Sequence, residues 1–520
     1  MRRSRFAGMG RLVPRLDDRG NVAIVVALAI APLTVAGLGA ADLARATSAK
    51  SQLQDALDAA ALGAARSTAQ TDSELKAAGD RILSQNLQLD EGLDLVSSSF
   101  AAGEGGTVVA SATLNVRPFI AGLLSDGIMS IDASTEVVRT SVKVEIALVL
   151  DTTGSMNEGT KLEDMKEAAA QFITKMEDAA KKSVEPDAVK IALVPFSNTV
   201  RVDETAYRNA TWVDQNGVSP INNEIFTTSS GTQQANRFTL FSNLNTTWRG
   251  CLEMRKAPHD VQDTPPAVGT PETLYTPYFA VDEPDVQTSG YARDYQNDYV
   301  PDNTNSNDWR VRQGMINKYA GKKKASLTTS FGPNRGCGLA RMRRLTTDFE
   351  GLRDDIDALN ADGNTNIPIG MSWGWNMVSP WGPFADGVAY GTPKYRKIVI
   401  LMTDGENTIA QRDTPNDGTY SGAGYIWQGR VIKSNGLPLG IGSSDSTRTA
   451  ALDYRLKLLC ENMKKKDIEI YTIRVVEGSS SLLEACASSR DHYYNVEDST
   501  TLTSVFQSIA GQISALRLSK

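Results

Sequence analysis

A stretch of 22 residues without a charged side chain, from Gly20 to Ala41, constrains this 520-residue chain most strongly. As a helix rising about 1.5 Å per residue it would span roughly 33 Å, enough to cross the hydrocarbon core of a membrane. Residues 1–19 carry six arginines against two aspartates. Because such basic segments stay in the cytoplasm, we expect a basic cytoplasmic tail at 1–19, a single transmembrane helix at 20–41, and everything after Asp42 outside.

A cleaved secretory signal is the alternative, with Gly39-Ala40-Ala41 as a small-residue cleavage site. The apolar stretch is longer than the about 7–15 residues of a signal's hydrophobic region, which favours a retained anchor. Under either interpretation the bulk of the chain is extracytoplasmic, where disulfides form. Of the three possible connectivities we expect Cys251–Cys337 and Cys460–Cys486, because each pair falls within one segment of the chain. Four buried free thiols are the alternative.

Composition argues against several functions. Asp and Glu outnumber Lys and Arg by 61 to 54, and the net charge of −7 argues against a protein that mainly binds nucleic acid. The chain has only two histidines, His259 and His492, which excludes a multi-histidine metal site. The absence of a G-x-x-x-x-G-K-[S/T] motif disfavours P-loop ATP hydrolysis.

The pattern of apolar residues changes at about residue 140. Residues 42–88 place leucine and alanine at helical spacing, and 107–116 and 129–138 alternate like strands, so we expect a helical stalk with a small β unit over 42–140. After residue 140, apolar runs typical of strands buried on both faces alternate with amphipathic segments. The expected strands are 144–150, 189–196, 397–403, 468–476 and 493–496, and the expected helices lie at about 160–180, 348–360, 446–466, 480–489 and 500–517.

Strands that alternate with helices predict an α/β fold, a doubly wound parallel sheet with right-handed crossovers, over residues 141–517. Two segments interrupt the alternation. The first, at about 200–345, is rich in Asn, Asp, Thr, Pro and aromatic residues, and the second, at about 408–446, is rich in Gly and Ser. Because a structureless loop as long as 200–345 is uncommon, we interpret that segment as an inserted subdomain and 408–446 as a smaller insertion.

Two aspartates follow predicted buried strands at the edge where open α/β sheets bind ligands. Asp151-Thr152-Thr153-Gly154-Ser155 comes after strand 144–150, and Thr403-Asp404-Gly405 comes at the end of strand 397–403. Asp151, Thr153 and Ser155 alternate along the turn, so their oxygens can converge on one point. Hard oxygen donors suit Mg²⁺, Mn²⁺ or Ca²⁺ rather than zinc or copper.

This Asp-x-Thr-Gly-Ser turn resembles the metal-ion-dependent adhesion site of von Willebrand factor type A domains, whose usual pattern is Asp-x-Ser-x-Ser. The resemblance implies a Rossmann-like type A fold over about 144–200 and 345–517. It also implies a threonine from a distant loop and an aspartate after a later strand. Thr365, in Asp362-Gly363-Asn364-Thr365-Asn366, and Asp404 fill these roles. The implied cofactor is a divalent cation, Mg²⁺ with Mn²⁺ or Ca²⁺ as alternatives, and its ligands are Asp151, Thr153, Ser155, Thr365 and Asp404.

In such sites the hydroxyls bind the metal directly, the carboxylates often act through water, and a partner's Asp or Glu fills an open coordination position. The resemblance therefore implies a binding module rather than an enzyme, with a protein partner that presents an acidic side chain. The alternative is that the same residues only cap a helix and turn the chain, without a working metal.

A second resemblance lies at the N-terminus. Arg19-Gly20-Asn21-Val22-Ala23-Ile24, the predicted span and the Ala-rich helix after it resemble the TadE/TadG-like segment of Flp (tight adherence) pilus-assembly proteins over about 15–65. Together with a type A domain, this pattern is similar to TadG-like bacterial proteins. It implies a single-pass protein of the bacterial inner membrane, largely periplasmic, that acts in pilus assembly or surface adhesion. A structural membrane scaffold and a metal-dependent hydrolase are the alternative functions.

Overall fold

The structure is a computed structural model that describes residues 18–518 except 68, 70, 104–106, 119–126, 139–141, 184, 229–230 and 286–294. Most of the expected basic tail, up to position 17, lies outside the described residues. The chain divides into two compact units, Met1–Thr140 and Ser141–Lys520.

The first unit begins with one long helix, α1 (Asp18–Arg66). Near its N-terminus the helix exposes apolar side chains, and Val25, Leu28 and Leu33 are 64%, 72% and 69% exposed. Among the described residues, α1 is the one helix that is long and apolar enough to cross a membrane, judged by length and composition. From Ala46 onward most of its alanines and leucines are buried instead, because they pack in the core of the first unit.

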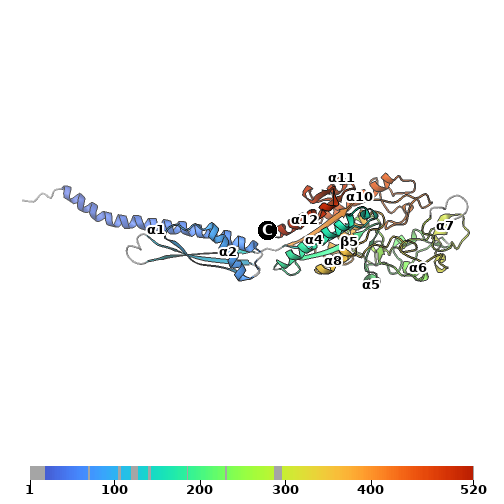
Figure 1. Cartoon of the computed structure of the whole chain (residues 1–520), viewed down its shortest axis with the longest axis horizontal. Coiled ribbons are helices and arrows are strands. Elements are labelled where there is room, and N and C mark those ends of the chain that lie inside the picture. The colour runs from blue at the N-terminus through green and yellow to red at the C-terminus, as the bar shows by residue number, and fades with distance from the viewer. Residues whose placement is uncertain are drawn as a thin grey trace, which may run out of the picture. The chain divides into compact units, whose positions relative to one another are not determined.

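A second helix and a three-stranded antiparallel sheet complete the first unit (Figure 1). These elements are α2 (Asp72–Asn86), β1 (Leu93–Ala102), β2 (Thr107–Val116) and β3 (Met129–Val138). The strands predicted at 107–116 and 129–138 are present, whereas β1 lies outside the predicted strands. The prediction of one helix over 42–88 is wrong, because Thr71 starts a new helix in a reciprocal capping box with Glu74.

The second unit has the predicted doubly wound α/β fold. Its five predicted strands form a parallel sheet in the order β13-β12-β11-β4-β5. They are β4 (Lys143–Asp151), β5 (Val189–Phe196), β11 (Tyr395–Thr403), β12 (Ile468–Val475) and β13 (Tyr493–Val496). Beyond β5 lie three short antiparallel strands, β6 (Val200–Arg201), β9 (Cys251–Leu252) and β10 (Arg343–Thr346).

Helices cover both faces of this sheet (Figure 1). One face carries α4 (Lys161–Lys181), α8 (Phe349–Asp357) and α12 (Leu502–Leu518), and the other carries α9 (Ile367–Val378), α10 (Asp445–Lys464) and α11 (Ser480–Cys486). Successive side chains of β4 point to opposite faces of the sheet, and each face has its own hydrophobic core. Ile146 and Leu148 pack under α4, and Ala147 and Val149 pack under α9.

The sequence does not predict α9, because Gly370 and Gly374 lower helix propensity. The glycines instead allow a close approach to the sheet. A Cβ on Gly374 would lie 2.4 Å from Val149 Cγ2, and one on Gly370 would lie 2.4 Å from Phe196 Cγ. This contact holds the N-terminal end of α9 at the carboxyl edge of the sheet.

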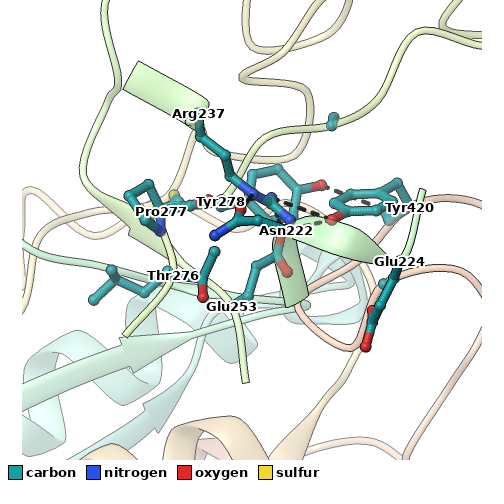
Figure 2. Close-up of polar contacts among 12 residues, drawn as sticks. Asn222, Glu224, Arg237, Glu253, Thr276, Pro277, Tyr278 and Tyr420 are labelled. Carbon is teal, nitrogen blue, oxygen red and sulfur yellow. Dashed lines mark hydrogen bonds and ion pairs between the residues drawn. The ribbon is translucent and has the colours of Figure 1, made fainter. Parts of the chain in front are cut away.

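The two insertions meet in a buried charge network (Figure 2). Arg237, from the first insertion, and Arg430, from the second, both pair with the fully buried carboxylate of Glu253. The Tyr420 hydroxyl donates to the same carboxylate, and Arg430 also pairs with Glu224. Because removing one partner would leave a charge buried and unpaired, this network fixes the insertions to each other.

Both predicted disulfides are present, and they use all four cysteines. Cys251–Cys337 joins β9 to the end of the first insertion, and Cys460–Cys486 joins α10 to α11. The first disulfide therefore closes the first insertion, and the second holds two helices of the second unit together.

We expect Gly374→Ala to destabilise the second unit by about 1–3 kcal/mol, because the new methyl group would overlap Val149. Urea unfolding followed by tryptophan fluorescence reports this unit alone, since all seven tryptophans lie in it. Gly511→Ala is the matched control: this exposed helical glycine has open space around its Cβ, and we expect a gain of up to about 1 kcal/mol.

Combining Gly374→Ala with Val149→Ala should cost less than the sum of the two separate changes, because the smaller side chain makes room for the methyl group. Native stability in Gly374→Ala would contradict the close approach of α9 to the sheet.

Candidate metal site

Two aspartates come together at the carboxyl edge of the sheet. β4 and β11 are parallel neighbours, with Leu150 opposite Met402, so Asp151 and Asp404 leave the sheet beside each other. Both side chains are fully buried. Burial, and then the nearby charge of Asp404, raise the pKa of Asp151 from 3.8 to about 6, although hydrogen bonds from Thr403 and Thr153 lower it.

A chain of hydrogen bonds connects the two carboxylates through the turn after β4. The Thr153 backbone N–H donates to Asp151 Oδ1 at 2.9 Å, and the Thr153 hydroxyl lies 3.1 Å from the Ser155 hydroxyl. The Ser155 hydroxyl in turn donates to Asp404 Oδ1 at 2.7 Å. The predicted convergence of Asp151, Thr153, Ser155 and Asp404 is therefore present.

Thr365, on the loop between α8 and α9, reaches the same place. A Cβ on Gly405 would lie 3.2 Å from Thr365 Oγ1 and 3.8 Å from Ser155 Oγ, so both hydroxyls face this glycine. The loop is held by the Gly154 N–H, which donates to the Gly363 carbonyl at 2.9 Å. The structure thus brings all five predicted residues to one edge of the sheet.

These side chains fit a hard divalent cation. Two carboxylates and three hydroxyls offer the oxygen donors that such ions prefer, and Gly405 leaves open the space that a Cβ would fill. Nowhere in the described part of the chain do three or more His, Cys, Asp or Glu side chains come together to hold a metal, so a cation here would depend on the hydroxyls. The two carboxylates alone would balance the charge of a divalent cation.

Sequence reasoning missed two residues of the site. The Thr403 hydroxyl donates to Asp151 Oδ2 at 2.6 Å, and Lys161 Nζ lies 2.9 Å from Asp404 Oδ2. Each of these residues could have been identified from its position in the sequence. Thr403 directly precedes Asp404, and Lys161 is the first residue of α4, where the helix dipole disfavours a positive charge.

A pocket of about 360 Å³ adjoins the loop that carries Thr365. Residues 362–364 form part of its lining, and residues of both insertions form most of the rest. Its charged lining residues are Glu283, Arg335, Asp362 and Arg412. The insertions therefore shape a polar hollow next to the candidate metal site.

Residues 20–67 match the family model for putative Flp pilus-assembly TadE/G-like proteins. No curated protein sequence matches the chain. Among solved structures, the von Willebrand factor domain of the type V pili tip protein Mfa5 from Porphyromonas gingivalis is similar at 12% identity and a TM-score of 0.34, over 72% of this chain and 96% of that chain.

Two further structures show a comparable likeness. The pilus adhesin SpaC from Lactobacillus rhamnosus GG has 10% identity and a TM-score of 0.33, over 82% of this chain and 36% of that chain. Proximal thread matrix protein 1 from the mussel byssus, with a zinc-occupied MIDAS motif, has 12% identity and a TM-score of 0.27, over 72% and 46%. At such scores the fold assignment rests on the strand order and helix layers of this chain itself.

We expect Thr403→Val to destabilise the second unit by about 1–3 kcal/mol at pH 8 in chelator, because the buried Asp151 carboxylate loses a donor. The loss should shrink at pH 5. Asp151, with a pKa of about 6, is then largely neutral in the folded state, and a neutral carboxyl needs this donor less.

Urea unfolding at both pH values measures the difference, and Thr403→Ser, which keeps the hydroxyl, is the control. A loss of stability that is the same at pH 5 and pH 8 would contradict the role of Thr403 as a donor to the ionised carboxylate.

Proposed function

We propose that this protein is a membrane-anchored extracytoplasmic binding protein of pilus assembly or surface adhesion. In this proposal the second unit is an elaborated von Willebrand type A domain that engages an acidic group of a protein partner through a divalent cation, Mg²⁺ first. The observation that carries the proposal is the buried cluster of Asp151, Thr153, Ser155 and Asp404, with Thr365 beside it.

The hydroxyls of Thr153, Ser155 and Thr365 would contact the cation, because those of Ser155 and Thr365 both lie near Gly405 and that of Thr153 lies 3.1 Å from the Ser155 hydroxyl. Asp151 is held by Thr403 and by the Thr153 N–H, so its charge is fixed in place. When bound, the cation supplies a positive centre that accepts a partner's carboxylate. The role is binding rather than catalysis, since both carboxylates of the cluster are buried and serve as hydrogen-bond acceptors.

The proposed location rests on other parts of the chain. The match of residues 20–67 to a TadE/G-like family model, and the exposed apolar side chains of α1, support a single-pass anchor in the bacterial inner membrane. Two disulfides support an oxidising compartment, the periplasm, for the second unit.

The pocket beside the loop of Thr365 supports a partner segment that extends beyond one carboxylate. Arg335 and Arg412 line it together with Asp362 and Glu283. We propose that residues next to the partner's acidic side chain enter this pocket, so that the insertions contribute to recognition.

A structural scaffold of the pilus machinery is the second candidate. It is favoured by the contact between Lys161 and Asp404, which places a positive charge at the site without any metal. In a scaffold, loss of Asp151 would spare assembly, whereas loss of the membrane anchor would not.

Calorimetry on the full chain in detergent, after chelator treatment, tests the binding function with Mg²⁺, Mn²⁺ and Ca²⁺. We expect one cation per chain, and at least about tenfold weaker binding in Asp151→Asn. Asp445→Asn, an exposed aspartate in the first turn of α10, is the matched control and should bind as the native chain does. A folded native chain that binds no cation, or equal binding in Asp151→Asn, would contradict the proposal.

A further inference from the structure

Lys161 is a buried cation inside the candidate metal site. It is 7% exposed, and its Nζ lies 2.9 Å from Asp404 Oδ2 and 3.5 Å from the Ser155 carbonyl oxygen. Asp404 Oδ1 accepts the Ser155 hydroxyl, so both oxygens of this carboxylate are already engaged. The ammonium group of Lys161 therefore contacts one proposed metal ligand, the Asp404 carboxylate, and the backbone of a second proposed ligand residue, Ser155.

The position of Lys161 is otherwise unfavourable. A lysine at the first residue of a helix meets the positive end of the helix dipole, and burying an ammonium removes its hydration. Nearby carboxylates must offset both effects. They are Asp404, which is fully buried, and Glu158, whose side chain is 69% exposed and lies 3.3 Å from Nζ. Asp404 is therefore the main partner of Lys161.

We infer that Lys161 competes with the metal for Asp404 and makes cation binding depend on the partner's carboxylate. This inference rests on the proposed function. Among the buried groups, Asp151 and Asp404 together carry two negative charges and Lys161 carries one positive charge. The Glu158 carboxylate is outside this sum because its side chain is 69% exposed to water. A divalent cation would leave the cluster one charge positive while Lys161 is present, but would neutralise it without Lys161.

A carboxylate from the partner would restore neutrality only when Lys161 is present. The cation and the acidic partner thus stabilise each other on the site. Without them, Lys161 keeps Asp404 paired and the site folded.

The test compares Mg²⁺ and Mn²⁺ binding by calorimetry in the full chain, with sodium acetate or with sodium chloride of the same ionic strength. We expect Lys161→Met to bind the cation at least about tenfold more tightly than the native chain, because a neighbouring positive charge is removed. Acetate should strengthen cation binding in the native chain and change it much less in Lys161→Met. Lys175→Met, an exposed lysine of the same helix, should behave as the native chain does.

A second variant guards against failure to fold. Lys161→Gln keeps a neutral donor for Asp404 and should also bind the cation more tightly, and thermal unfolding in chelator reports whether each variant is folded. If the native chain binds the cation and both variants bind it equally or less tightly, the inference fails while the proposed function stands. If neither the native chain nor the folded variants bind a cation, both fail.

Discussion

The constraint on which the site depends is the mutual repulsion of two carboxylates that neighbouring parallel strands force together out of water. Parallel pairing of β4 and β11 brings Asp151 and Asp404 to one buried place. The surrounding groups offset this repulsion by hydrogen bonds or by a positive charge. Thr403 and the Thr153 N–H donate to Asp151, and Ser155 and Lys161 donate to Asp404. The pKa of Asp151, still raised to about 6, shows that burial and repulsion are only partly offset. Such a cluster gains from a divalent cation.

The rest of the second unit holds this cluster in place at the carboxyl edge of the sheet. α9 lies close to the strands because Gly370 and Gly374 have no side chains, and the loop before it places Thr365 beside Gly405. The insertions contribute the pocket wall next to that loop, and they are fixed by the network around Glu253 and by Cys251–Cys337. A rigid frame of this kind suits the proposed function, in which a partner's acidic side chain would meet a cation held in one position.

The sequence predicts what depends on local pattern and misses what depends on distant contacts. Strands buried on both faces are visible as continuous apolar runs, and Asp151 and Asp404 are predictable because they follow two of them. The residues of α9 have a low helix propensity, and the helix is stabilised by packing on the sheet, where its glycines allow close contact with Val149 and Phe196. Lys161 stands out locally only as a positive charge at the start of a helix, and its pairing with Asp404, 243 positions away, comes from the fold. The break between α1 and α2 could have been predicted, because Thr71 and Glu74 form a capping box that can be recognised in the sequence.

The most direct measurement is anomalous X-ray diffraction from crystals of the chain grown with saturating Mn²⁺ and acetate. We expect one strong peak within about 2.5 Å of the hydroxyl oxygens of Thr153 and Ser155, with acetate on the same ion and Lys161 Nζ moved away from Asp404. A crystal without a peak at this edge of the sheet, or with Mn²⁺ bound only elsewhere, would contradict the proposed metal site.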